Sequence, residues 1–341
     1  MKKKQKKLGV NVKIVDAQND PAKQANDISD LIQQKVDVLL INPVDSAAVS
    51  TSVAAANKAS IPVLALDRSA DKGTVASFIA SDNVKGGEMA AEYIIQKLGE
   101  KVKVAELEGI PGASATRERG EGFHKVAYQK LTVVAKQSAD FDRSKGLTVA
   151  ENMLQANPDI QAIFAQNDEM ALGAIEAAKS ANKKIFIVGF DGTQDGLKAV
   201  EAGTMAATIA QQPELMGQQG LDAAVKVAKG EKVEAKIGVP LKLVDKNNYC
   251  PLTIWTNIKT PAQCAGVLFY PAQASEINAF LLKAILQINE PFITLSIAAF
   301  LITIAYTIRH MPFFCFQSHF TNERAFIHYR ITKSVCRSSP R

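Results

Sequence analysis

Residues 160–200 read IQAIFAQNDEMALGAIEAAKSANKKIFIVGFDGTQDGLKAV. Two short apolar runs, 160–165 and 185–190, alternate in this stretch with segments of helical spacing at 169–181 and 196–202. A short, continuous apolar run bounded by polar residues predicts a strand that is buried on both faces. Two such strands, each followed by a helix, predict a parallel sheet with helices packed on it.

The same alternation extends from this stretch toward both ends of the chain. Apolar runs predict further strands at 10–17, 36–41, 61–66, 76–79, 102–107, 131–136, 206–210 and 241–244. Helical spacing predicts further helices at 21–35, 46–59, 83–98, 114–128, 144–155 and 213–229. One sheet does not comfortably hold this many strands. We therefore predict an α/β fold of two doubly wound lobes, each with its own parallel sheet.

The composition changes along the chain near residue 249. The 341 residues carry a formal net charge of +6, but 249–341 hold eight basic and three acidic residues, whereas 1–248 hold 32 basic and 31 acidic residues. All four cysteines, the only tryptophan and three of the four histidines lie in 249–341. The near-neutral segment, residues 1–248, therefore has no cysteine nucleophile, and with His124 alone it is a poor candidate for a hydrolytic triad or a zinc site. Its composition indicates binding rather than catalysis.

Polar and aromatic side chains follow several of the predicted strands. Ligands bind beyond the carboxyl ends of the strands in open α/β sheets, so these side chains are candidates for a binding site. They are Asp67, Arg68, Arg119, Phe141, Asn167, Asp191 and Gln211. Carboxylates accept hydrogen bonds, guanidinium groups donate them, amides do both, and an aromatic ring can cover the C–H face of a sugar. The set predicts recognition of a polyhydroxylated small molecule.

The spacing alone leaves a purely structural explanation open for most of these residues. Asp67 and Arg68 can form an ordinary ion pair, and Arg119 can be a charge on a helix surface. Phe141 can belong to the core. Asn167 or Asp168 can cap the following helix, and Asp191 with Gly192 can form a turn. Position in the sequence does not decide between these explanations and a binding role.

Eight longer segments carry a resemblance to a known family. They read LLINPVDSAAV (39–49), IPVLALDR (61–68), IASDNVKGGEMAAEYI (79–94), ATRERGEGF (115–123), ADFDRSKGL (139–147), IFAQNDEMALGA (163–174), VGFDGTQDGLKAV (188–200) and AATIAQQPE (206–214). They resemble the periplasmic ribose-binding proteins, which are the sugar-binding components of ABC importers and have the type I periplasmic-binding fold. The resemblance runs nearly collinearly from about residue 8 to residue 246.

The resemblance implies two similar α/β lobes that are joined by three hinge crossings and close on the sugar. By position, the hinge crossings fall on Ser81 and Asp82, Gln211 and Gln212, and Pro240 and Leu241. The first lobe would then comprise 1–81 with 212–240, and the second lobe 82–211 with 241–246.

The resemblance also implies roles for the seven strand-end residues, because the family's sugar contacts fall on them. Phe141 would stack on the sugar ring, and the hydroxyl groups would be fixed by Asp67, Arg68, Arg119, Asn167, Asp191 and Gln211. A protein of this family is expected to be a monomer without enzymatic activity, cofactor or metal. It is expected to bind D-ribose or a similar monosaccharide in the periplasm, to deliver it to an ABC transporter permease, and to bind no nucleic acid.

The sequence departs from the family pattern at its start. Family members begin with a signal peptide, a first strand and a loop whose Asn and two Phe complete the sugar pocket, whereas this sequence starts inside the following helix. We therefore expect the first lobe to lack its first strand. Burial of the about four apolar side chains of such a strand stabilises the fold by on the order of 6–12 kcal/mol. The net free energy of unfolding of a whole domain is only about 5–15 kcal/mol. We expect a loosened first lobe and much reduced sugar affinity, which tight ribose binding in calorimetry would contradict.

Residues 249–341 do not resemble the family. Within them, 291–308 reads PFITLSIAAFLITIAYTI, eighteen residues without a charge. That length is near the minimum for a membrane-spanning helix. A membrane anchor is one interpretation, and an accidental apolar run in an unrelated extension is the one we favour.

Other function classes remain open at this stage. A sugar-responsive regulator of the lactose-repressor type shares the two-lobe fold, but it would need a helix-turn-helix before the first lobe. An enzyme that acts on a pentose would need a base or nucleophile that the sequence does not offer. A degenerate copy that binds nothing is the remaining alternative, and a binding assay distinguishes it.

Overall fold

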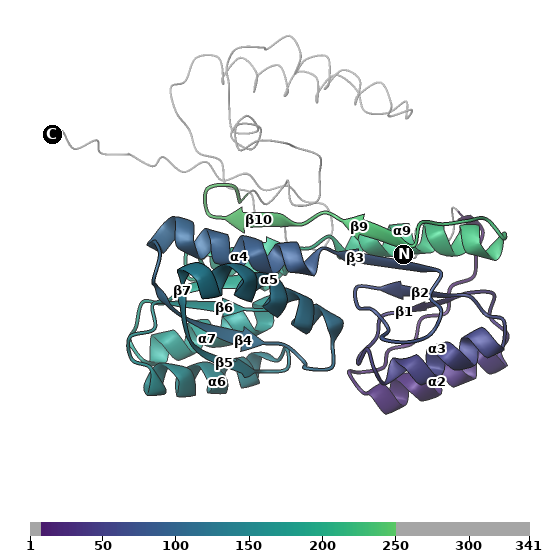
Figure 1. Ribbon diagram of the computed structural model, residues 1–341, viewed down its shortest axis with the longest axis horizontal. Coiled ribbons are helices and arrows are strands. Elements are labelled where there is room, and N and C mark those ends of the chain that lie inside the picture. Colours follow the sequence, from purple (N-terminus) through teal and green to yellow (C-terminus); the bar gives the residue numbers. More distant parts are fainter. Residues whose placement is uncertain (1–7, 250–341) are drawn as a thin grey trace, which may run out of the picture. The chain divides into compact units, whose positions relative to one another are not determined.

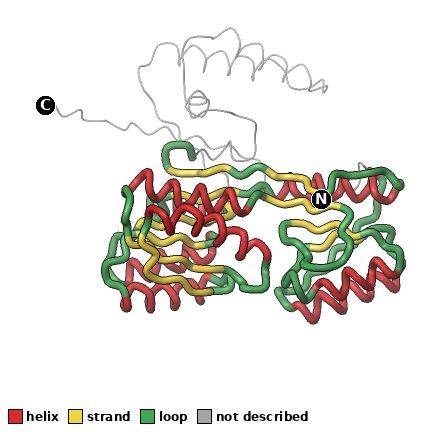
Figure 2. The backbone as a smooth tube through the Cα atoms, viewed as in Figure 1, coloured by secondary structure: helices red, strands yellow, loops and turns green. Residues whose placement is uncertain are grey.

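Two sheets with helices on both faces make up residues 8–249, the stretch of the chain that the computed structural model describes (Figure 1, Figure 2). The first sheet has the order β1-β2-β3-β9, with β1 (Leu39–Ile41), β2 (Val63–Leu66), β3 (Ser77–Ser81) and β9 (Lys236–Val239). All its strands are parallel. We call this sheet, with the helices that pack on it, the first lobe.

The second sheet has the order β10-β8-β7-β6-β4-β5. Its strands are β4 (Lys103–Glu108), β5 (Thr132–Ser138), β6 (Ala162–Ala165), β7 (Phe186–Asp191), β8 (Ala207–Ala210) and β10 (Lys242–Asp245). Five of them are parallel, and β10 runs antiparallel to β8. This sheet and its helices form the second lobe, and the predicted α/β class is confirmed.

In the first lobe, neighbouring residues of one strand pack into two different cores. Val63 points to the side of α2 (Pro21–Gln33) and α3 (Val49–Lys58). Leu64 points to the opposite side, where α9 (Pro213–Ala228) covers the sheet. Successive side chains of a strand face opposite ways, so a strand between two helical layers must be apolar throughout. This explains the unbroken apolar runs of the sequence.

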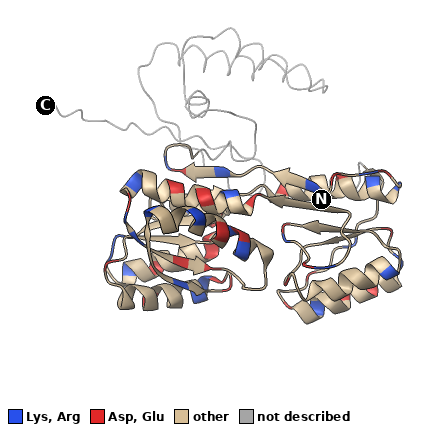
Figure 3. Cartoon of the chain, viewed as in Figure 1, with Lys and Arg blue, Asp and Glu red and all other residues tan. Residues whose placement is uncertain are grey.

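The second lobe repeats the arrangement on a larger scale. Helices α4 (Asn83–Leu98) and α5 (Ser114–Lys130) cover one face, where the Phe123 and Phe164 rings stack with their centroids 4.7 Å apart. The other face carries α6 (Arg143–Ala156), α7 (Asp168–Ser180) and α8 (Gln194–Ala202). Figure 3 shows that both acidic and basic residues occur along α4 and α5.

Side-chain caps fix where most of these helices begin. Asp82 accepts from the Lys85 amide at 3.0 Å, and Asp142 and Asn167 do the same for the first turns of α6 and α7. A cap of this kind satisfies one of the amide groups that the first turn leaves unpaired. The caps place the helix starts directly after strand ends, so cap residues and candidate binding residues share the same loops.

The chain passes between the two sheets at three places: from β3 to α4, from β8 to α9, and from β9 to β10. The second and third passages contact each other, because Gln212 Nε2 donates to the Pro240 carbonyl at 2.9 Å. Ser81, at the first passage, is buried.

Two predictions of secondary structure are wrong. Residues 10–17 are not a strand: no described strand pairs with them, and Ile14 is 63 % exposed. A strand needs a neighbour for its backbone hydrogen bonds, so β-branched composition alone does not make one. The strand β9 was not predicted, because its four residues include Gly238 and an exposed Lys236.

No helix within residues 8–249 is long and apolar enough to cross a membrane. Residues 250–341, which include the apolar run 291–308, lie outside the described residues.

Two glycines bring α4 and α5 unusually close together. A Cβ atom on Gly122 would lie 1.8 Å from the Val84 carbonyl oxygen, and one on Gly87 would lie 2.1 Å from the Arg119 carbonyl oxygen. Any other residue would push the two helices apart. The contact matters beyond the packing, because Arg119 lies on α5 at this point.

We expect Gly122→Ala to lower the free energy of unfolding by about 1–3 kcal/mol, the usual cost of overpacking. Gly238→Ala is the matched control, because a Cβ there would meet nothing within 4 Å. Urea denaturation of both variants checks the expectation. Equal stability of the two variants would contradict the close approach of the helices.

Candidate functional site

A cavity of about 690 Å³ lies where the carboxyl ends of the two sheets face each other. All seven strand-end residues predicted from the sequence line this cavity: Asp67, Arg68, Arg119, Phe141, Asn167, Asp191 and Gln211. The first two come from the first lobe, after β2, and the others from the second lobe and from the passage between β8 and α9. Residues from distant positions in the sequence are thus brought to one place.

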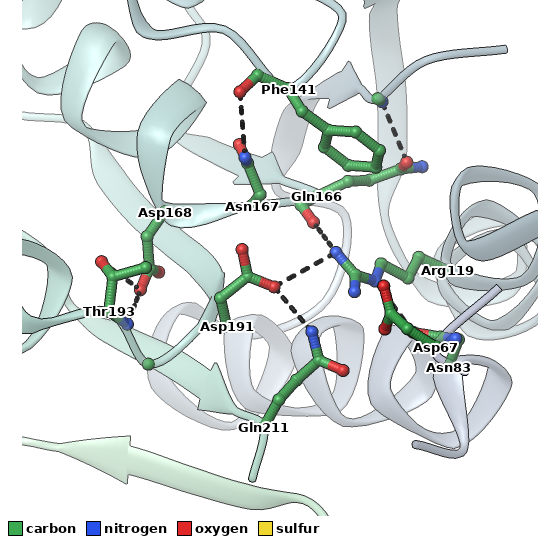
Figure 4. A network of polar contacts seen from close by, with 12 residues as sticks. Asp67, Asn83, Arg119, Phe141, Gln166, Asn167, Asp168, Asp191, Thr193 and Gln211 are labelled. Atoms are coloured by element: carbon green, nitrogen blue, oxygen red, sulfur yellow. Dashed lines mark hydrogen bonds and ion pairs between the residues drawn. The ribbon is translucent and has the colours of Figure 1, made fainter. Parts of the chain in front are cut away.

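Arg119 occupies the inner wall of the cavity, and only 3 % of it is exposed. Its Nη1 donates to the Gln166 carbonyl at 2.5 Å, and its Nε donates to Asn83 Oδ1 at 2.9 Å (Figure 4). Its guanidinium carbon lies 3.8 Å from the centre of the Phe190 ring and 5.7 Å from that of Phe141. Arg119 is therefore a buried hydrogen-bond donor, held in place by these bonds, and not a charge on the helix surface.

Asp191 is the carboxylate opposite Arg119. Its Oδ1 lies 3.5 Å from Arg119 Nη1 and accepts from Gln211 Nε2 at 2.8 Å (Figure 4). Burial raises the pKa of Asp191 to about 6, although the Arg119 guanidinium and the Gln211 hydrogen bond act in the opposite direction. Since 28 % of its side chain stays exposed, a ligand in the cavity can still reach this carboxylate.

Asp67 and Arg68 contribute the charges of the first lobe. Arg68 Nε lies 3.8 Å from Asp67 Oδ2, so the pair is loose, and its guanidinium carbon lies 5.4 Å from the Phe141 ring centre. Asp67 also accepts a long hydrogen bond of 3.4 Å from Asn42 Nδ2, and Asn42 lines the cavity as well. Burial lowers the pKa of Arg68 below the usual value of a guanidinium, with Asp67 acting against this.

Phe141 and Asn167 are linked by a direct hydrogen bond. Asn167 Nδ2 donates to the Phe141 carbonyl at 3.1 Å, and Asn167 Oδ1 caps α7 by accepting from the Met170 amide at 2.9 Å. The Phe141 ring packs on Gly109, where a Cβ atom would come within 2.1 Å of it. Asn167 is thus both a helix cap and a residue of the cavity wall, so the structural explanation and a position in the candidate site do not exclude each other.

Three of the cavity residues have backbone angles that non-glycine residues seldom adopt. Their φ values are +64° at Asp67, +60° at Phe141 and +113° at Asp191. Such conformations cost of order 1–3 kcal/mol each and cluster at functional sites. Asp191 departs furthest from the left-handed region near +60°, so its backbone is the most strained of the three.

Two buried polar atoms of the cavity residues have no hydrogen-bond partner within the described residues: Arg68 Nε and Gln211 Oε1. One is a donor and the other an acceptor, and buried groups of this kind are normally paired. A ligand with hydroxyl groups can accept from the first and donate to the second, since a hydroxyl does both.

The rims of the two lobes touch beside the cavity. The Ser46 amide donates to the Gly112 carbonyl at 3.0 Å, and the Ser69 amide donates to Ser114 Oγ at 2.9 Å. Arg117 Nη2 pairs with Asp71 Oδ1 at 2.8 Å. These contacts join the loops after β1 and β2 to the loop before α5 and to its first turn.

Some lining residues were not predicted from the sequence. Asn42, Thr193, Gln194 and Met216 line the cavity together with the seven predicted residues. Asn42 also follows an apolar strand, so the strand-end rule could have found it, whereas Met216 lies inside α9 and offered no such signal. Within residues 8–249 no group of three or more His, Cys, Asp or Glu is placed to hold a metal ion.

Residues 1–232 match the family model described as periplasmic binding protein domain. The ribose import binding protein RbsB of Bacillus subtilis (strain 168) is 60 % identical over 243 residues, which cover 71 % of this chain and 80 % of that protein. The protein of the same name from Escherichia coli (strain K12) is 57 % identical over 242 residues, which cover 70 % of this chain and 82 % of that protein.

A solved structure shows the same similarity in three dimensions. It is an ABC transporter periplasmic solute binding protein from Actinobacillus succinogenes 130z with bound D-allose, and it matches with a TM-score of 0.67 at 29 % identity. The match covers 72 % of this chain and 90 % of that chain.

A buried carboxyl group behind the cavity residues, that of Asp168, makes the stability of the protein depend on pH. Burial raises the pKa of Asp168, behind the wall, from 3.8 to about 7. The folded state therefore holds a proton that the unfolded state releases, so stability falls as pH rises from about 4 to 7, by up to about 4 kcal/mol for this group. We expect Asp168→Asn to flatten this fall, and the exposed Asp37→Asn to leave it unchanged.

Urea denaturation at a series of pH values measures this slope directly. Parallel pH dependences for the wild-type protein and Asp168→Asn would contradict the raised pKa.

Proposed function

The chain belongs to the periplasmic binding protein family, and on that premise we propose that it binds a monosaccharide, D-ribose first of all, for import by an ABC transporter. The observation that carries the proposal is the cavity itself. The seven residues predicted from the sequence, two from the first lobe and five from the second lobe and its passage to α9, line one space. The relatives from Bacillus subtilis and Escherichia coli, which are more than half identical to this chain over most of their own length, are ribose import binding proteins.

The wall chemistry suits a ring that carries several hydroxyl groups. Asp67 and Asp191 accept hydrogen bonds from hydroxyls, and Arg68 and Arg119 donate to hydroxyl or ring oxygens. Gln211 can do both, with its Oε1 still unpaired within the described residues. Each charge-assisted hydrogen bond contributes roughly 1.5–3 kcal/mol. The face of Phe141 offers apolar contact to the C–H groups of the sugar.

We propose that the lobes close on the sugar by bending at the three passages: Ser81 with Asp82, Gln211 with Gln212, and Pro240 with Leu241. The sugar would favour the closed arrangement because Asp67 and Arg68 come from one lobe and Arg119 and Asp191 from the other. The rim contacts Ser46 to Gly112 and Asp71 to Arg117 would add to the closed state. Gln211 would serve both as a sugar contact and as a hinge residue.

Binding without catalysis is the activity that we propose. The single histidine of the described residues, His124, pairs with Glu106 at 2.5 Å and does not line the cavity. The cavity thus has no histidine general base. We further propose a periplasmic, monomeric protein that needs no cofactor, has an ABC permease as its partner and binds no nucleic acid.

Isothermal titration calorimetry with D-ribose tests the proposal. We expect one sugar per chain, and 2-deoxy-D-ribose to bind at least tenfold more weakly, because it leaves a buried partner of the missing hydroxyl unpaired. Asp191→Asn should weaken D-ribose binding about tenfold or more. The control is Asp195→Asn, an exposed α8 residue paired with Lys198. No heat of binding with the folded wild-type protein, or equal affinity of both variants, would contradict the proposal.

The affinity for D-ribose should also depend on pH. Below about 6 Asp191 takes up a proton, so it loses the charge that strengthens its hydrogen bonds to hydroxyls. We expect the dissociation constant to rise severalfold between pH 7 and pH 5, and this rise to be absent in Asp191→Asn. The same pH profile in both proteins would assign the effect to another group.

A further inference from the structure

Asp168 is a fully buried carboxylate that the proposed binding reaction does not use. It is 0 % exposed, and it does not belong to the lining of the cavity. It lies directly behind the turn between β7 and α8, which begins at Asp191. Burying an ionisable side chain is costly, so its hydrogen-bond partners should show what it does there.

All three direct partners of Asp168 hold the residues that follow Asp191. Oδ2 accepts from the Thr193 amide at 2.7 Å and from Thr193 Oγ1 at 3.1 Å (Figure 4). Oδ1 accepts from Thr208 Oγ1 at 2.7 Å, and Thr208 Oγ1 itself accepts from the Gly192 amide at 3.2 Å. The first two peptide N–H groups after Asp191 are thus both held by one buried network.

The conformation of Asp191 shows why such a network is needed. Its φ of +113° is followed by +73° at Gly192, so the chain leaves β7 through two consecutive positive-φ residues. A strained backbone of this kind persists only where its surroundings determine it. The network of Asp168, Thr193 and Thr208 fixes both peptide groups on the far side of the strained residue.

The space around Asp168 is closed on two sides. A Cβ atom on Gly189 would lie 2.4 Å from Asp168 Oδ1, and one on Gly196 would lie 2.2 Å from Oδ2. The carboxylate therefore cannot move away from its partners without displacing backbone. The network holds whether or not the carboxyl is protonated, because a neutral carboxyl can donate to Thr208 Oγ1 while Gly192 still donates to that oxygen.

We propose that Asp168, acting through Thr193 and Thr208, is the positioning residue that holds Asp191 in its sugar-binding conformation. The inference rests on the proposed function, since Asp191 is its proposed sugar contact. Asp168 and Thr208 themselves touch no sugar. They set the direction from which the Asp191 carboxylate meets a hydroxyl.

Thr208→Val tests the inference most cleanly, because it keeps the shape of a buried residue and removes only the hydroxyl. We expect the dissociation constant for D-ribose, measured by calorimetry, to rise at least tenfold. Thr208→Ser restores the hydroxyl and should restore most of the affinity. Thr204→Val is the matched control: its hydroxyl bonds to the Ala199 carbonyl at 3.2 Å, outside the network, and the affinity should stay within twofold.

A double-mutant cycle separates positioning from a general loss of structure. If Thr208 acts through Asp191, Thr208→Val should change the affinity of an Asp191→Asn protein by less than twofold. Equal losses in both backgrounds would overturn the inference. So would a Thr208→Val protein that binds D-ribose like the wild type, whereas a folded wild-type protein without ribose binding would overturn the proposed function instead.

Amide hydrogen exchange provides a readout that does not depend on the sugar. In the ligand-free protein, Thr208→Val should speed exchange at Gly192 and Thr193 at least tenfold and leave the α4 amides unchanged. If Thr208→Val does not fold, Thr208→Ala, which also removes the hydroxyl group, takes its place in both measurements, with the same expected outcomes. Unchanged exchange at Gly192 and Thr193 would contradict the network.

Discussion

The Arg119 guanidinium lies near the rings of Phe141 and Phe190 and joins the elements of the second lobe that form the cavity wall. It donates to the end of β6 through the Gln166 carbonyl and to the start of α4 through Asn83. It faces Asp191 at the end of β7. A buried guanidinium requires its donors to be satisfied, so the ends of these elements cannot move independently of it. The close approach of α4 and α5 at Gly87 and Gly122 brings Arg119 to this position.

Two buried carboxylates support the cavity from behind. Asp168 accepts hydrogen bonds from the turn after Asp191. Glu106, in the middle of β4, accepts from Gln166 Nε2 at 2.8 Å, and Gln166 Oε1 accepts from the Gly109 amide at 3.1 Å. Gln166 thus links the ends of β4 and β6, next to the glycine on which the Phe141 ring packs. The charges that face the cavity rest on a second set of polar groups inside the lobe.

The sequence predicted the helices and the buried strands well, because their signals are local. Helix α4 begins and ends where the sequence indicates, with Asp82 as its cap and Gly99 after its last residue. Six of the seven predicted cavity residues lie at or just after strand ends, which the topology of parallel strands brings together, whereas Arg119 lies inside α5 and reaches the cavity from that helix. The sequence could not predict features that depend on a neighbouring strand. Residues 10–17 pair with no described strand, and β9 forms because it can pair with the edge strand β3. The role of Asp168 was hidden for the same reason, since Thr208 lies forty residues away.

A crystal structure of the full chain with D-ribose tests the central claim most directly. We expect one ribose in the cavity between the lobes. Its hydroxyl oxygens should lie within hydrogen-bond distance of Asp191 and Arg119 from one lobe and of Asp67 and Arg68 from the other, with its ring against Phe141. A ribose that is bound elsewhere, or one that contacts residues of a single lobe only, would contradict a sugar site shared between the two lobes.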